Sequence, residues 1–307
     1  MKKNIEKILE DYRKITNKGK LANYIPALYK EENKNDLGLC IIDKEDNIIG
    51  HGDYKKKFTI QSISKVLTLM IAIKDQGIDH VFSKVGYEGS DDPFNSFTKL
   101  DLGENRKPAN PMINSGALTV TSLIKGQGDE KFSRILDFTR TITKNPNLNY
   151  NQEIYISELE TNDRNRSIAY LLKSKGLIQG DIQDIMDAYC KQCSIEVNTI
   201  DLANIGRFIS NGCRGLVKEE SDNKKITQII KGILLACGMY DYSTQYSINV
   251  GIPSKSGVGG GIMGVLPDGG GIGAYGPSLD SYGNSIAGIE LLKDISQEFA
   301  YNIFTKY

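Results

Sequence analysis

The stretch GGIMGVLPDGGGIGAYG, residues 260–276, carries the clearest fold signal in this sequence. It holds two short apolar runs separated by Pro267-Asp268-Gly269, residues that pre-set the backbone of a tight turn. Two such runs joined by a turn predict an antiparallel β-hairpin. Residues 37–53, LGLCIIDKEDNIIGHGD, repeat the pattern near the other end of the chain. The sequence therefore predicts strands at both ends.

The sequence between these two hairpins has helical periodicity. Apolar residues recur at helical spacing from Ile60 to a stop near Gly77, and residues 83–111 then form a loop-like segment rich in Gly, Asp, Asn and Pro. Further helices are predicted at about 114–126, 130–143, 163–175, 181–193, 199–210 and 223–237. The middle of the chain is therefore predicted to be an α-helical block.

The two chain ends complete the pattern. Residues 3–16 predict a helix before the first hairpin, and strand-type periodicity returns from about residue 244. The sequence NSIAGIELLKDISQEFAYNIF, residues 284–304, predicts a strand that passes into a terminal helix.

One antiparallel sheet built from both chain ends is the arrangement that joins these elements most simply. We therefore predict an α+β fold with a central antiparallel sheet, flanking helices and an inserted helical lobe. We expect residues 1–307 to form a single domain, because this length suits one large domain with an ample core. Its α/β part would cover about 1–67 and 241–307, and its helical lobe about 68–240.

Charge and hydropathy exclude several functional classes. The 38 basic and 38 acidic residues balance, so no electrostatic feature predicts binding to nucleic acid or to an anionic membrane. The N-terminal MKKNIEKILEDYRKITNKGK is an amphipathic helix pattern without the apolar core of a signal peptide. No run approaches the ~18 apolar residues that cross a bilayer. We therefore expect a cytoplasmic protein.

Cysteine and histidine usage argues against several kinds of site. The five cysteines, an odd number, are expected to be reduced thiols in a cytosolic chain. Cys190 and Cys193 form a C-x-x-C pair, but no second pair and almost no histidine could complete a metal site. We therefore expect no metal and no cofactor. Because His51 and His80 are the only histidines, base chemistry that does not use histidine is the better starting hypothesis.

Two further motifs are better explained structurally. Gly259, Gly261 and Gly264 match G-x-G-x-x-G, but a hairpin follows where a dinucleotide-binding fingerprint needs a helix. We interpret them as strand glycines that let another backbone or a ligand come close. The SDN sequence at 221–223 lies in a charged segment just before a helix, so we interpret it as a helix cap.

Four pairs of residues have S-x-x-K spacing, which on a helix puts a hydroxyl and an amine on one face. They are Ser62/Lys65, Ser96/Lys99, Ser122/Lys125 and Ser221/Lys224. A lysine base must be partly desolvated for its pKa to fall toward neutrality. Only Lys65 has apolar neighbours on both sides, and Ser62 begins the same helix. A capping serine beside a snorkelling lysine is the alternative.

A late motif supports the first pair. Lys255-Ser256-Gly257 matches K-[ST]-G on a predicted strand that could place a backbone N–H opposite the nucleophile. S-x-x-K on an early helix followed by K-S-G on a late strand is the pattern of serine acyl-transfer enzymes of the β-lactamase/transpeptidase class.

Longer stretches narrow this class. The chain resembles the serine-dependent glutaminase family of β-lactamase-like fold, bacterial type, in NYIPALY, FTIQSISKV, NPMINSGAL, SELETNDRN, AYCKQCSIEV, CGMYD and KSGVGGGI. The match extends from about residue 23 to 262 and into the tail GPSLDSYGNSIAGIE. Ser115 departs from the usual alanine, a change that should matter little.

The resemblance implies hydrolysis of L-glutamine to L-glutamate and ammonia, with Ser62 as nucleophile and Lys65 as its partner. It assigns to the substrate pocket Tyr24, Asn114, Glu158, Asn165, Tyr189, Tyr240 and the backbone of Val258. These residue types suit the substrate, since Glu158 can bind the ammonium and the two asparagines can donate N–H bonds to the carboxylate. Tyr240 and Lys65 are both candidates for the group that moves the proton.

Two alternatives share the scaffold. A penicillin-interacting serine hydrolase would carry the same two motifs, and a non-catalytic glutamine-binding protein would keep the pocket without turnover. The family resemblance also implies a homodimer or homotetramer.

Overall fold

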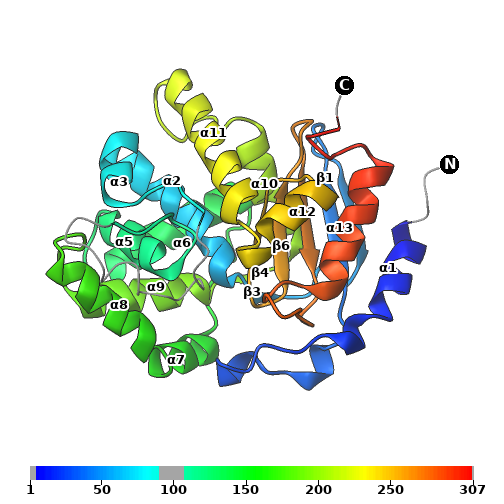
Figure 1. The fold of residues 1–307 in the computed structure, drawn as a ribbon, viewed down its shortest axis with the longest axis horizontal. Coiled ribbons are helices and arrows are strands. Elements are labelled where there is room, and N and C mark those ends of the chain that lie inside the picture. The colour runs from blue at the N-terminus through cyan, green and yellow to red at the C-terminus, as the bar shows by residue number, and fades with distance from the viewer. Residues whose placement is uncertain (1–4, 90–106, 306–307) are drawn as a thin grey trace.

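The computed structural model describes residues 5–89 and 107–305 (Figure 1). Its central sheet has the strand order β2-β1-β7-β6-β5, and every neighbouring pair is antiparallel. The strands are β1 (Gly38–Ile42), β2 (Ile48–Gly52), β5 (Ser254–Ser256), β6 (Gly261–Val265) and β7 (Gly271–Tyr275). Both predicted hairpins are therefore confirmed, and β1 joins them by pairing with β7.

Helices cover both faces of this sheet. On one face α1 (Ile5–Arg13), α12 (Ser243–Asn249) and α13 (Ile286–Glu298) form a core with inward-facing strand residues such as Leu39 and Ile41. On the other face α10 (Thr199–Ser210) packs against Cys40 and Ile42. Successive residues of β1 thus point into opposite layers, because side chains alternate along a strand.

Glycines let α10 lie directly on the sheet. A side chain added at Gly206 of α10 would put its Cβ 2.0 Å from the carbonyl oxygen of Gly264 on β6. One added at Gly273 of β7 would meet the carbonyl oxygen of Thr199 at 2.2 Å. The glycine-rich strands are therefore explained by close backbone contact, as predicted for the G-x-G-x-x-G match.

The remaining helices surround a second and larger core beside the sheet (Figure 1). They are α2 (Ser64–Gln76), α3 (Ile78–Lys84), α5 (Asn114–Leu123), α6 (Asp129–Thr143), α7 (Gln152–Glu160), α8 (Asp163–Ser174), α9 (Ile182–Cys193) and α11 (Glu220–Cys237). All the helices predicted for the middle of the chain are present. The division into an α/β part and a helical lobe at residues 67 and 241 stays a prediction.

A two-stranded sheet links the two regions. Strand β3 (Phe58–Thr59) pairs with β4 (Glu196–Val197), and Phe58 stacks on Tyr275 of the main sheet with ring centroids 4.3 Å apart. This link fixes the chain just before α2.

Two local predictions were wrong, and two helices were missed. Residues 243–249 form helix α12 instead of a strand, and the ring of Tyr246 in this helix is buried with its hydroxyl 2.9 Å from Ser254 Oγ. The terminal helix α13 begins at Ile286 without a preceding strand, and Ser285 Oγ caps it by accepting from the N–H of Gly288. Helices α3 and α7 were not predicted.

The SDN interpretation was also wrong. Ser221 lies inside the first turn of α11, whose N-cap residue is Glu219. Asn223 instead fixes the preceding loop, since its side-chain amide both accepts from the N–H and donates to the carbonyl of Val217.

Among residues 5–89 and 107–305, no helix combines the length and the apolar character that crossing a bilayer requires.

Candidate active site

Ser62 lies at the entrance to α2, in a 3-10 turn formed by Gln61–Ile63. Gln61 adopts a left-handed conformation with φ +49°, which is uncommon for a residue with a side chain. This bend carries the chain from β3 into α2 and leaves Ser62 partly exposed while its neighbours are buried. The Ser62 side chain is therefore accessible, and the buried residues of α2 hold its backbone in place.

That surface is the wall of a cavity of about 430 Å³, a suitable size for a small molecule. Its lining comes from the segment before β1, the start of α2, α5, and helices α7 to α9. The lining residues are Tyr24, Ile25, Gln61, Ser62, Asn114, Glu158, Thr161, Asn162, Arg164, Asn165, Tyr189 and Cys193. Six residues that the sequence predicted for the pocket are brought together here, and neither histidine is among them.

Lys65 lies one helical turn from Ser62 and is completely buried. Its ammonium donates to the carbonyl of Met112 at 3.0 Å and to Asn114 Oδ1 at 2.7 Å. The amide of Asn114 in turn donates to Asn165 Oδ1 at 3.0 Å. Burial lowers the pKa of Lys65 to about 8, because the uncharged amine needs less solvation. Lys65 therefore orients a chain of amides that ends in the cavity.

The other S-x-x-K pairs differ from this one. Lys125 and Lys224 are exposed, as a solvated lysine would be. The pair Ser96/Lys99 lies outside the described residues.

Glu158 places a carboxyl group in the cavity wall from helix α7. Its side chain is buried, and its Oε2 atom has no hydrogen-bond partner. Burial raises the pKa of Glu158 to about 8, against the opposing effects of Cys193, Gln61 and the charge on Lys65. An unpartnered buried carboxylate oxygen favours a cationic ligand, since a cation would supply the missing interaction.

Tyr240 lies at the start of the turn Tyr240–Tyr242. Its φ of +53° is again left-handed, and its hydroxyl lies 3.3 Å from the carbonyl of Ser256 on β5. Burial raises the pKa of this phenol to about 12, although a hydrogen bond with Ser62 acts to lower it. The phenol of Tyr240 therefore reaches the Ser62 hydroxyl directly.

Residues 257–259 run alongside the backbone that leads to Ser62. A Cβ added at Gly257 would lie 2.8 Å from the carbonyl oxygen of Ile60, and one at Gly259 would lie 2.4 Å from that of Thr59. Only glycines permit this approach, which holds Val258 between them beside the start of α2.

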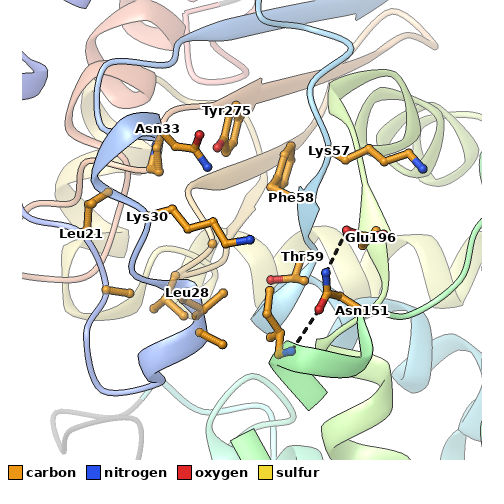
Figure 2. Close-up of a pocket in the computed structure, with 16 residues that line it drawn as sticks. Leu21, Leu28, Lys30, Asn33, Lys57, Phe58, Thr59, Asn151, Glu196 and Tyr275 are labelled. Carbon is orange, nitrogen blue, oxygen red and sulfur yellow. Dashed lines mark hydrogen bonds between the residues drawn. The ribbon is translucent and has the colours of Figure 1, made fainter. Parts of the chain in front are cut away.

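Val258 and Gly259 also line a second, smaller cavity of about 90 Å³, which Figure 2 shows. There Asn151 joins the neighbouring elements, since its amide donates to Glu196 and its carbonyl oxygen accepts from the N–H of Ile154. Ser62 lines the larger cavity and not this one.

Seven residues of this site were not predicted from the sequence. The side chain of Lys255 is completely buried against Tyr240, and the other six line the cavity: Ile25, Gln61, Thr161, Asn162, Arg164 and Cys193. The C-x-x-C pair is not a disulfide, since Cys190 and Cys193 are both free thiols. The signal for Cys193 was its spacing, because four residues place it one turn beyond Tyr189 on the same face of α9.

Comparisons with known proteins identify the family that this chain resembles. A family model described as glutaminase matches residues 19–304. "Glutaminase 2" of Clostridium perfringens is 52% identical over 306 residues, covering 99% of this chain and 100% of that protein. A glutaminase of Clostridioides difficile is 48% identical, over 98% of this chain and 97% of its own length.

Solved structures give the same result. A probable glutaminase from Bacillus subtilis, complexed with 6-diazo-5-oxo-L-norleucine, is 36% identical with a TM-score of 0.87, over 99% of this chain and 98% of that one. A covalent complex of a Bacillus subtilis glutaminase with 5-oxo-L-norleucine, formed by reaction with the same compound, has a TM-score of 0.84 at 36% identity, with 98% of each chain covered.

Proposed function

Because the chain belongs to the glutaminase family and is an L-glutamine amidohydrolase, we propose that Ser62 carries the reaction through a covalent glutamyl ester. The observation that carries this proposal is the shared cavity of Ser62 and Glu158. The hydroxyl of Ser62, which contacts the phenol of Tyr240, lies in the same cavity as the unpartnered Oε2 of Glu158. These two groups suit the two ends of a glutamine molecule.

Substrate binding would use the polar groups of the cavity wall. Glu158 would bind the α-ammonium, because a cation beside its unpartnered oxygen offsets the cost of the buried charge. Asn165 would bind the α-carboxylate, with Asn114 fixing the orientation of its amide through the bond to Asn165 Oδ1. The hydroxyls of Tyr24 and Tyr189 would complete the donors around the substrate.

The reaction would begin with attack of Ser62 Oγ on the side-chain amide carbon. The tetrahedral oxyanion would lie between the backbone N–H groups of Ser62 and Val258. Tyr240 would take the proton from Ser62 Oγ and give it to the leaving nitrogen, so that ammonia departs and the glutamyl ester remains. Water would then hydrolyse the ester by the same route, releasing glutamate and regenerating Ser62.

Two contacts favour Tyr240 over Lys65 as the proton carrier. The phenol of Tyr240 is hydrogen-bonded with Ser62, whereas the ammonium of Lys65 bonds with the carbonyl of Met112 and with Asn114. Lys65 would instead hold the amide chain and contribute positive charge beside the nucleophile.

Replacing Ser62 with alanine tests the covalent step. We expect Ser62→Ala to lose ammonia release from glutamine, and to lose the mass gain that 6-diazo-5-oxo-L-norleucine produces in the wild-type protein. The reaction of the Bacillus subtilis relative with this compound supports the choice of probe. Ser221→Ala, a serine of an exposed S-x-x-K pair, is the matched control and should keep both signals. Ammonia release at the wild-type rate by Ser62→Ala would refute the proposed nucleophile.

Membership of the glutaminase family favours glutamine hydrolysis over the two alternatives, a penicillin-interacting hydrolase and a non-catalytic glutamine-binding protein.

A cytoplasmic location and a homodimeric or homotetrameric state are part of the proposal. The five free cysteine thiols support the first, because reduced thiols are typical of the cytoplasm, and the family resemblance supports the second. Light scattering coupled to size-exclusion chromatography would measure the oligomeric state.

A further inference from the structure

Lys255 is a buried charge-bearing side chain to which the proposed reaction assigns no role. It lies in the middle of β5, is 0% exposed, and belongs to the K-S-G motif. Its amine donates to the carbonyl of Ser256 at 2.7 Å and to that of Gly238 at 3.1 Å. A lysine is rarely buried unless its amine has partners that offset the lost hydration. This position therefore suggests a function for the amine.

The amine of Lys255 also lies over the aromatic ring of Tyr240. Its Nζ is 4.4 Å from the ring centroid, inside the range of a cation–π contact. The hydroxyl of Tyr240 lies 3.3 Å from the carbonyl of Ser256, the same carbonyl that Lys255 bonds. The carbonyl of Ser256 therefore contacts both the amine of Lys255 and the hydroxyl of Tyr240.

The backbone around Tyr240 needs such support, because its left-handed φ of +53° is unfavourable for a residue with a side chain. Lys255 holds the carbonyl of Gly238, two residues before Tyr240. Asn284 donates to the carbonyl of Met239, and Ser243 donates to that of Tyr240 itself at 2.6 Å. The phenol is thus aimed at Ser62 by contacts on consecutive carbonyls.

The charges of the Lys255 amine and the Tyr240 phenol also affect each other. Burial shifts the pKa of the Lys255 amine well below its ordinary value, and the nearby charge of Lys65 adds to this effect. Negative charge that develops on Tyr240 acts in the opposite direction, because it favours the protonated amine. A protonated Lys255 and a phenolate therefore stabilise each other, and the complete burial of Lys255 strengthens this attraction.

From this geometry we infer that Lys255 is a positioning residue, which holds the Tyr240 ring against Ser62 and stabilises the phenolate that accepts the Ser62 proton. This inference rests on the proposed role of Tyr240 in the reaction.

Substitutions that remove the charge test this role. We expect Lys255→Met to lower kcat by about 30-fold, the scale of a desolvated cation–π contact, with KM changed less than about threefold. The acidic limb of the kcat/KM profile should move to higher pH, because a phenol without the cation is a weaker acid. Lys255→Gln, which keeps a donor for the carbonyls but no charge, should show the same shift and covers the case that Lys255→Met does not fold.

Lys131→Met is the matched control. Lys131 is also buried and donates to backbone carbonyls, those of Thr121 and Ser122, but at the end of α5 away from the cavity. Its loss should lower Tm without moving the pH limb. An unchanged pH limb in a folded Lys255→Met or Lys255→Gln variant would overturn the inference.

A double substitution separates this inference from the proposed mechanism. In a Tyr240→Phe background, Lys255→Met should reduce kcat no further, because the residues act as a unit. Wild-type activity of Tyr240→Phe would show that the proposed proton carrier is wrong. A strongly reduced but measurable kcat of Tyr240→Phe, together with a full additive loss from Lys255→Met, would leave the mechanism in place and reject the link to Lys255.

Discussion

Glu158 is a residue whose proposed binding role lowers the stability of the folded protein. Its carboxyl is buried with an unpartnered oxygen, and its pKa is raised to about 8. In the unfolded chain the same group ionises near its ordinary value of 4.5. The folded protein therefore binds more protons between these values, and its stability falls as the pH rises through this window.

Glu158→Gln should consequently weaken catalysis and strengthen the fold. We expect kcat/KM for glutamine to fall about 10–100-fold, the scale of a lost hydrogen bond to a charged group. The Tm of Glu158→Gln should match the wild-type value near pH 5 and exceed it increasingly toward pH 9. Kinetics and thermal unfolding over this pH range would measure both effects. A constant Tm difference at every pH would show that the carboxyl is not destabilised by burial.

At the scale of single residues, the sequence predicted those features that have a local pattern and missed those that have none. Ser62 and Lys65 were singled out by the apolar positions around them, and that burial is present. The orphan oxygen of Glu158 and the left-handed φ of Gln61 and Tyr240 had no sequence signal. The orphan oxygen and the two φ angles are features of the folded backbone and its packing, which a local sequence pattern does not encode.

Helix α10 shows how glycines set the spacing of an element. Its backbone touches β6 and β7 because Gly206 and Gly273 have no side chains, and a Cβ at Gly206 would overlap the carbonyl of Gly264 at 2.0 Å. The backbone of α10 and the backbone of β6 cannot move apart to accept this Cβ as a flexible side chain would.

Gly206→Ala should therefore destabilise the protein by about 1–3 kcal/mol, the scale of an overpacked core. The expected gain in helix propensity, about 0.5–1 kcal/mol, is smaller. Gly232→Ala in α11 is the control, because open space surrounds that position, and it should stabilise by about 0.5–1 kcal/mol. Urea unfolding would measure the two free energies. Equal effects of the two substitutions would contradict the packing explanation.

Helix α7 shows why element prediction failed near the site. Its sequence QEIYISELE exposes Ile156 and buries Glu158, so the apolar face is interrupted at the residue with a proposed functional role. The available signal was Asn151, whose side chain caps the helix by accepting from the N–H of Ile154.

For the whole molecule, the decisive feature is that strands from both ends of the chain pair to form one sheet. Strand β1 pairs with β7 from Gly38 opposite Tyr275 to Ile42 opposite Gly271. Lys20 forms a further bridge with Leu279. Ser62 follows the early strands and Val258 belongs to the late ones, so the proposed oxyanion site exists only after the ends have joined.

This arrangement predicts that β1 opens only with the whole sheet. In hydrogen exchange, the backbone amides of β1, β6 and β7 should belong to one slowest class, with equal opening free energies. Exchange followed by mass spectrometry over a range of denaturant would measure them. Amides in β1 that exchange well before those of β7 would show instead that the N-terminal hairpin unfolds separately.

The sequence by itself determined the two hairpins and most of the helices, and it suggested the proposed nucleophile with its lysine, because each depends on local patterns of apolar, turn and small residues. Only the tertiary structure decided that Glu158 carries an unpartnered oxygen, that Tyr240 reaches Ser62, and that Lys255 lies over the Tyr240 ring. These contacts join residues from distant elements, and their geometry follows from packing of the sheet against the helices, which no local pattern encodes.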